Sequence, residues 1–139
     1  MSANSLMLTI GKDKMTTTFV EPSETLPCPA PFQARDAFWF PVRAIAEAAG
    51  YEVLYYPLSP SGIGEHLCYV EINMGDVALC FYYDNTTSES TAYIEDYVTI
   101  MPVMLKEGRL YAAKEFFTDY LGFGYSCNTP VVVFGLRYE

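Results

Sequence analysis

The side chains with the greatest chemical potential in this sequence are one histidine and four cysteines. His66 and Cys68 stand two residues apart on an expected strand, so their side chains point the same way instead of toward each other. A catalytic Cys–His pair needs mutual hydrogen-bond reach and an orienting third group. We therefore expect no catalytic residue and no metal ligand. No Cys-x-x-Cys spacing occurs among Cys28, Cys68, Cys80 and Cys127, which argues against zinc-ribbon and thioredoxin-like chemistry.

Cys68 and Cys80 flank a turn, and the length of that turn decides whether they face each other. A three-residue loop of Asn73, Met74 and Gly75, with Gly75 left-handed, places Cys68 opposite Cys80 and permits a cross-strand disulfide. A two-residue loop at Met74 and Gly75 places them on opposite faces. Two packed free thiols are the favoured interpretation, because facing positions alone do not supply disulfide geometry.

Arg43 and Glu47 are the charged pair with the clearest helical spacing, since residues i and i+4 are neighbours on a helix. They could form a polar site at the start of the helix or an ordinary surface ion pair. The second interpretation is favoured, because exposed pairs of this kind are common.

Aromatic residues make up 16% of the chain, with 12 Tyr and 9 Phe. Packing within sheets is the favoured interpretation of this content, because strands are rich in aromatic residues. The alternative is a dedicated binding surface, which predicts that several rings lie exposed along one groove. The candidates for that surface are Trp39, Tyr55, Tyr56, Tyr82 and Tyr83.

Two short helices are expected, over residues 42–49 and 113–120. In each segment the apolar residues recur at i, i+3, i+4 and i+7, which is the pattern of a single buried face. Pro41 suits the start of the first helix, and Gly50 and Gly122 suit the ends of the two helices. Helices this short are marginal alone, so each must pack against a sheet.

The remaining chain is rich in β-branched and aromatic residues, interrupted by turn residues, which predicts antiparallel strands. Three prolines lie within residues 27–31, so residues 21–31 are expected to form a loop or an edge segment. The predicted fold class is α+β, with meander sheets curled around the helices. The expected strands cover residues 6–10, 38–40, 51–56, 67–72, 77–83, 97–101, 123–127 and 131–134.

The chain repeats its pattern at a period of about 70 residues. Each half contains an apolar strand, a turn region, an amphipathic helix and a glycine that ends it. The expected organisation is therefore two related halves, each an antiparallel sheet around one helix. The first covers residues 1–60 and the second, more divergent half covers residues 61–139, with a flexible connector at residues 57–64.

The formal net charge is −9, from 17 acidic and 8 basic residues. Such a surface repels phosphate backbones, so nucleic acid is not an expected partner. No apolar run approaches the roughly 20 residues that a membrane-crossing helix needs, so membrane insertion is not expected. Exposed sheet edges allow pairing between copies of the chain, which makes a homo-oligomer an open alternative.

One stretch of the first half carries a family resemblance. Leu8-Thr9-Ile10-Gly11, followed by a segment that begins Phe40-Pro41-Val42-Arg43 and ends at Gly50, resembles the copper amine oxidase N-terminal-like domain. In the second half Ala113-Lys114-Glu115 stands where Pro-Val-Arg is expected. The resemblance implies an antiparallel sheet twisted around a helix, a structural or interaction role, and a location in the cell envelope or outside the cell.

The resemblance does not imply amine oxidase activity. That reaction needs copper held by several imidazoles, and this chain has one histidine. We expect no cofactor. Three hypotheses remain: a non-enzymatic structural or interaction module with an unknown protein or glycan partner, a carbohydrate- or peptide-binding domain that uses exposed aromatics, and a small intracellular enzyme. Residues 1–11 do not resemble a signal peptide, so a cytoplasmic location stays open.

Overall fold

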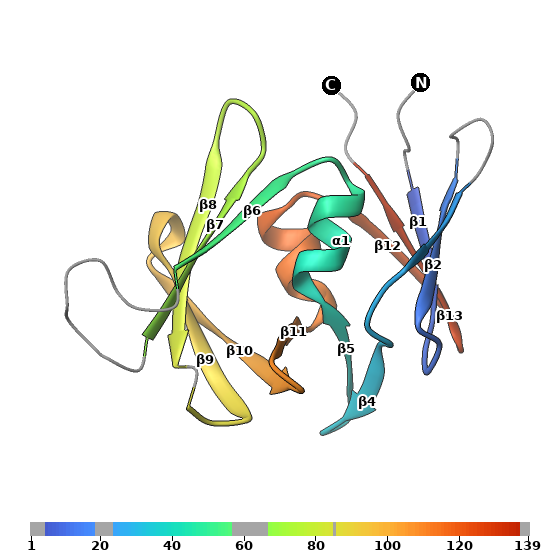
Figure 1. The fold of residues 1–139 in the computed structure, drawn as a ribbon, viewed down its shortest axis with the longest axis horizontal. Coiled ribbons are helices and arrows are strands. Elements are labelled where there is room, and N and C mark those ends of the chain that lie inside the picture. Colours follow the sequence, from blue (N-terminus) through green and yellow to red (C-terminus); the bar gives the residue numbers. More distant parts are fainter. Residues whose placement is uncertain (1–4, 19–23, 57–66, 85, 137–139) are drawn as a thin grey trace.

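The computed structural model describes residues 5–18, 24–56, 67–84 and 86–136, and it contains two antiparallel sheets with three short helical segments. Figure 1 shows the helix α1 (Val42–Ala48) and the π-helix η2 (Phe116–Tyr120) lying between the two sheets. A single 3₁₀ turn, η1 (Glu95–Tyr97), precedes β10. Among the described residues, no helix has the length and apolar character needed to cross a membrane.

The smaller sheet has five strands and joins the two ends of the chain. Its order is β12 (Gly124–Asn128), β13 (Val131–Gly135), β1 (Ser5–Thr9), β2 (Lys14–Thr18) and β3 (Glu24–Pro27). The proline-containing β3 lies at the edge of this sheet. Of the two alternatives expected for residues 21–31, a loop or an edge segment, this part of the range forms an edge strand.

The larger sheet has eight strands. Its order is β4 (Phe32–Ala34), β5 (Ala37–Pro41), β11 (Arg109–Ala112), β10 (Thr99–Lys106), β9 (Glu89–Ile94), β8 (Ala78–Asp84), β7 (Leu67–Asn73) and β6 (Glu52–Tyr56). This sheet curls, and α1 contacts β5, β6 and β11 across the opening that the curl leaves.

Both sheets combine strands from the two expected halves. The hairpin that follows α1, β6–β7, pairs with β8 in the larger sheet, and the hairpin that follows η2, β12–β13, pairs with β1 in the smaller sheet. The prediction of mostly antiparallel sheets around short helices is confirmed. The expectation of a separate sheet for each half is corrected by this pairing, because sheet hydrogen bonds join strands from both sides of residue 60. That the halves are related stays a prediction.

The helix α1 matches its sequence pattern. Val42, Ile45 and Ala46 are buried, and the helix ends just before Gly50, which has a φ of +93°. The second helical segment differs from the expected α-helix, because it forms a π-helix over Phe116–Tyr120.

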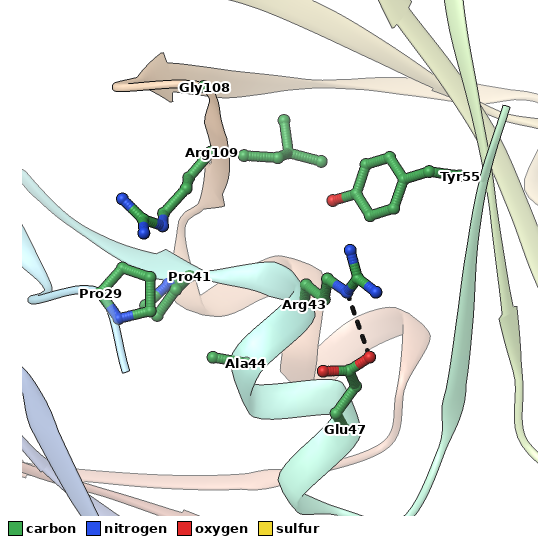
Figure 2. A pocket seen from close by; sticks show the side chains of 9 residues that line it. Pro29, Pro41, Arg43, Ala44, Glu47, Tyr55, Gly108 and Arg109 are labelled. Carbon is green, nitrogen blue, oxygen red and sulfur yellow. Dashed lines mark hydrogen bonds and ion pairs between the residues drawn. The ribbon is translucent and has the colours of Figure 1, made fainter. Parts of the chain in front are cut away.

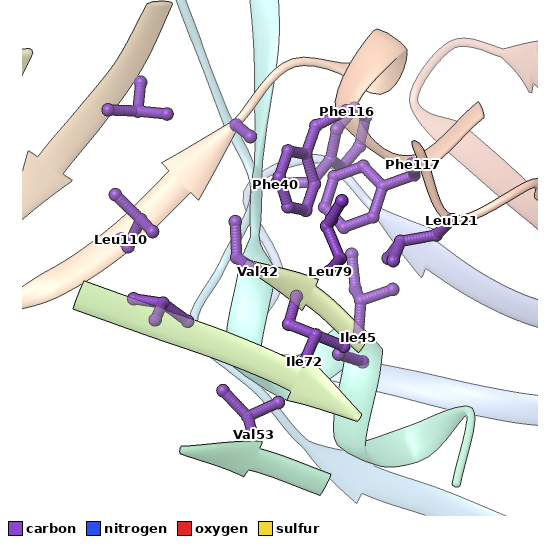
Figure 3. Close-up of a cluster of buried hydrophobic side chains, with 14 of the residues drawn as sticks. Phe40, Val42, Ile45, Val53, Ile72, Leu79, Leu110, Phe116, Phe117 and Leu121 are labelled. Carbon is purple, nitrogen blue, oxygen red and sulfur yellow. The ribbon is translucent and has the colours of Figure 1, made fainter. Parts of the chain in front are cut away.

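Phe116 and Phe117 are adjacent in sequence, and both are 0% exposed. The positions i+3 and i+4 lie on one wide apolar face of the segment 113–120, and this face is broad enough for the two rings to contact different sheets. The ring of Phe116 lies 5.3 Å from Phe81 of the larger sheet, and the ring of Phe117 lies 5.0 Å from Phe134 of the smaller sheet. Figure 3 shows Phe116 and Phe117 beside Phe40 and Leu121 in this core. The two phenylalanines therefore join the sheets.

We predict that Phe117→Ala destabilises the fold by about 3–5 kcal/mol, because it removes a fully buried ring at the junction of the sheets. Urea unfolding followed by circular dichroism measures this change. The control is Phe117→Leu, which keeps most of the apolar volume and is expected to cost less than the alanine variant. A loss below about 1 kcal/mol for Phe117→Ala would show that the sheets do not depend on this ring.

The hairpin between β7 and β8 has a different register from the one expected. Asn73 pairs with Ala78, and the N–H of Met74 donates to the carbonyl of Val77 at 2.8 Å, so residues 74–77 form the loop. In this register Cys68 pairs with Tyr83, and Cys80 pairs with Glu71. The facing of Cys68 and Cys80 that a three-residue loop would give is corrected, since the longer loop places them on opposite faces of the sheet. Both thiols are free, as the favoured interpretation required.

This geometry predicts four free thiols after denaturation of a sample purified without reductant. In the folded protein, the exposed Cys127 is expected to react with a thiol reagent first, whereas the buried Cys28 and Cys68 are protected. Burial and the nearby Asp13 carboxylate raise the pKa of the Cys28 thiol to about 11, which suppresses its reactive thiolate form. A count of two thiols in denaturant that rises to four on reduction would contradict the register described above.

Candidate functional site

A row of four tyrosines, the tyrosine stripe, crosses the outer face of the larger sheet. Tyr56, Tyr69, Tyr82 and Tyr93 lie on β6, β7, β8 and β9, and each pairs directly with the next across the strands. Successive ring centroids are 5.8, 6.5 and 5.2 Å apart. The opposite face of these strands carries core residues such as Val70 and Phe81, so the stripe occupies the face turned away from the helices.

The five aromatic residues predicted from the sequence separate into three environments. Tyr56, at 39% exposed, and the half-buried Tyr82 belong to the stripe. Trp39 and Tyr83 are buried, and the indole N–H of Trp39 donates to the carbonyl of Ala34 at 2.8 Å. Tyr55 points to the inner side of the sheet, where it lines a cavity. Of the five predicted rings, Tyr56 and Tyr82 therefore share one face of the sheet, and the other three lie elsewhere.

Sequence reasoning missed Tyr69 and Tyr93. The signal that could have found them is the alternation along each strand, in which Tyr69 follows the buried Cys68 and Tyr93 follows the buried Ala92. The register of the β7–β8 hairpin is also needed, because it places Tyr69 opposite Tyr82.

Apolar side chains extend the stripe at its β10 end. Ile100 pairs with Tyr93 and is 66% exposed, and Val98 in the preceding turn is 75% exposed. Val98 also has a φ of +47°, a conformation that β-branched residues rarely adopt and that is strained. The sheet thus presents a row of apolar and aromatic side chains over five adjacent strands.

Acidic side chains lie beside the tyrosine stripe. The hydroxyl of Tyr69 donates to Glu95 Oε1 at 3.0 Å, and Glu71 lies on the same outer face, opposite Cys80. A hydrogen bond with the Cys80 thiol, then burial and the hydrogen bond with Glu95, raise the pKa of Tyr69, so its hydroxyl stays protonated at neutral pH. Strands β6, β7, β8 and β9 contain no Lys or Arg. The stripe is therefore an aromatic surface bordered by negatively charged side chains.

A second feature, the seam cavity, lies where the curled sheet opens on its inner side. Arg43 from α1, Tyr55 from β6 and Arg109 from β11 line it, and its volume is about 340 Å³. Figure 2 shows the Arg43 guanidinium turned toward Tyr55, with Glu47 bound to it. Glu47 Oε2 accepts a hydrogen bond from Arg43 Nε at 3.1 Å, which confirms the expected ion pair.

Within the described ranges, no group of three or more His, Cys, Asp or Glu residues is arranged to hold a metal ion. His66, the neighbour of Cys68 at a spacing of two residues, lies outside the described residues.

Comparison of the chain with protein-family models, with curated proteins and with solved structures found no match.

Several tyrosine hydroxyls have raised pKa values, which predicts a loss of stability in alkali. Burial is the main cause for Tyr55 and Tyr125, whose pKa values rise to about 12, and also for Tyr83, whose pKa rises further. A pKa raised on folding stabilises the protein fully below the unfolded value of about 10, and this stabilisation is lost as the pH rises through the folded value.

The Cys28 thiol, whose pKa rises to about 11, adds a loss that begins near its unfolded value of about 8.5. We therefore expect the urea midpoint to begin to fall near pH 9 and to fall most steeply between pH 10 and pH 12. Tyr83→Phe keeps the buried ring and removes its titration, so the fall in this variant should be smaller than in the parent chain. An equal fall in the two proteins would show that ionisation of Tyr83 does not contribute.

Proposed function

We propose that this chain is a non-catalytic binding module that contacts a partner protein through the tyrosine stripe. The observation that carries the proposal is the unbroken row of rings from Tyr56 to Tyr93, continued by the exposed Ile100. Tyrosine offers a large apolar area and a hydroxyl at a low cost in conformational entropy, and for this reason it is frequent in protein interfaces. Cross-strand pairing already holds these rings in place, which lowers the entropy lost on binding.

The charge around the stripe supports a partner with basic groups. Glu71 and Glu95 border the rings, the four strands that bear them contain no Lys or Arg, and the chain as a whole carries a net charge of −9. Lysine and arginine side chains can contact both a tyrosine ring and a neighbouring carboxylate. A basic peptide segment or protein surface is therefore the occupant that fits best.

A second candidate function is the binding of a glycan. Four tyrosine rings at regular strand spacing form an elongated surface with hydroxyls along it, which also suits the alternating apolar faces and hydroxyl edges of a sugar chain. The two candidates differ in salt dependence, because binding of a basic protein weakens with added salt whereas binding of a neutral sugar does not.

We also propose that the chain is a copper amine oxidase N-terminal-like domain from a cell-envelope or secreted protein, built from two related units. The supporting observation is the repeated order of strand, short helix, left-handed glycine and hairpin. It occurs once in β5, α1, Gly50 and β6–β7, and again in β11, η2, Gly122 and β12–β13. Pairing between copies through the edge strands β6 and β12 remains an alternative mode of association.

The test is the double variant Tyr82→Thr/Tyr93→Thr, in which threonine keeps the preference for a strand but removes the rings. Immobilised basic, acidic and neutral peptides and an array of oligosaccharides are the probes. We expect the parent chain to be retained by basic peptides and the double variant to bind them at least about tenfold more weakly, because tyrosine is enriched among the interface hot spots, whose truncation costs about 2 kcal/mol or more.

The matched control is Met7→Thr, which removes an exposed apolar side chain from β1 of the other sheet and should leave binding unchanged. Thermal unfolding of each variant shows that it is folded. Retention by oligosaccharides that is lost in the double variant would favour the second candidate. Equal binding by the parent and the double variant would reject the stripe as the contact surface.

A further inference from the structure

The seam cavity differs in character from the tyrosine stripe and lies on the other side of β6. Tyr55 lines the cavity, while its neighbour Tyr56 belongs to the stripe, because successive residues of a strand face opposite sides of the sheet. We propose that the seam cavity binds the carboxylate of a small ligand with an apolar body, such as the last residue of a peptide or a free acylated amino acid, between Arg43 and Arg109.

The first argument is charge. The chain has 8 basic residues against 17 acidic ones, yet two arginines line this one cavity together with a single acid, Glu47. The lining is thus locally positive on a strongly negative molecule. Such a concentration of positive charge attracts an anion that the remaining surface repels.

The second argument is that both guanidinium groups keep N–H donors available for a ligand. Two neighbours hold the Arg43 side chain over the cavity. Glu47 forms an ion pair with it, and the centroid of the Tyr55 ring lies 5.5 Å from Arg43 Cζ. The bond to Glu47 uses Nε, one of several N–H donors of the group. Glu107 Oε2 lies 4.0 Å from Arg109 Nη1, well beyond the roughly 2.7–2.9 Å of a charge-assisted hydrogen bond. The planar donor sets of both arginines match a carboxylate.

The third argument concerns the rest of the lining. Burial raises the pKa of Tyr55 to about 12, so its hydroxyl is a neutral donor at physiological pH and adds no negative charge. Pro29, Pro41, Ala44 and Leu110 supply an apolar wall. The volume of about 340 Å³ is at the lower end of the range of roughly 300–1,000 Å³ that is usual for ligand sites.

These features favour a carboxylate with an apolar body over a bare phosphate. A dianion gains from the arginines but is also repelled by the Glu47 carboxylate in the same wall, and it leaves the apolar wall uncovered. A single carboxylate suffers less repulsion, and an attached aliphatic group covers the prolines and Leu110.

The experiment is a calorimetric titration of the purified chain with N-acetyl-leucine and with N-acetyl-leucinamide, which differ only in the charge of the terminal group. A short peptide that ends in leucine, with a free or an amidated terminus, forms the second pair of ligands. We expect each acid to bind at least about tenfold more tightly than its amide. A larger difference in the peptide pair would identify a peptide terminus as the ligand, and an equal one a free small acid; either result supports the proposal.

Arg109→Gln and Arg43→Gln are each expected to weaken binding of the acid by about tenfold and to leave binding of the amide nearly unchanged. The control is Arg35→Gln, which alters net charge equally at an arginine that pairs with Glu89 outside the cavity. The stripe variant Tyr82→Thr/Tyr93→Thr should bind the acid as the parent does, so failure of this site and failure of the stripe are distinguishable.

Four results would overturn the proposal. The first is the absence of measurable binding by either acid. The second is equal affinity for acid and amide. The third is an equal loss of affinity in Arg35→Gln and Arg109→Gln, which would show that net charge alone explains the preference for the acid. Inorganic phosphate is titrated in parallel, and phosphate binding as tight as that of the acids would also reject a site built for a carboxylate with an apolar body.

Discussion

The structure depends on the burial of two consecutive phenylalanines between two sheets. Phe116 packs on Phe81 of the larger sheet, and Phe117 packs on Phe134 of the smaller one. A helix this short is marginal alone, so its stability comes from packing, and here its apolar face contacts a ring from each sheet. The position of η2 between the sheets follows from this constraint, and Phe40 of β5 completes the junction through its contacts with both Phe117 and Phe134.

This filled interior determines where the chain can bind other molecules. The inner faces of both sheets are covered by one apolar core, which includes Leu6 and Phe134 of the smaller sheet and Val70 and Phe81 of the larger sheet. The outer face of the larger sheet carries the tyrosine stripe, which is ordered by strand pairing and not by the core. The seam cavity exists because the larger sheet curls without closing, and α1 lies across the opening between β6 and β11.

The two surfaces differ in the interactions they can make. The stripe combines aromatic rings with neighbouring carboxylates, which suits a basic and extended partner. The seam cavity combines two arginines with proline and leucine, which suits a small acid. Because Tyr55 and Tyr56 are adjacent on β6, both surfaces share one strand, and a change in the position of β6 would affect both.

Most of the local structure could be predicted from the amino-acid sequence. Strong apolar patterns located α1 and strands such as β1, β7, β8 and β13, because burial selects residue type at a fixed period. It did not reveal β2 or β9, whose threonine-, serine- and glutamate-containing segments carry a weak apolar signal, nor the short β4 and β11. The Arg43–Glu47 pair was also predictable, since both residues belong to one helix.

Contacts between residues far apart in the chain could not be predicted in this way and came from the packing of the elements. The β7–β8 register, changed by a loop longer than expected, separated Cys68 from Cys80 and aligned Tyr69 with Tyr82. The pairing of β13 with β1 joined the two ends of the chain in one sheet, and the curl of the larger sheet brought Arg109 near Arg43. Local composition does not encode such relations, because they depend on loop lengths and on packing between elements that are far apart in sequence.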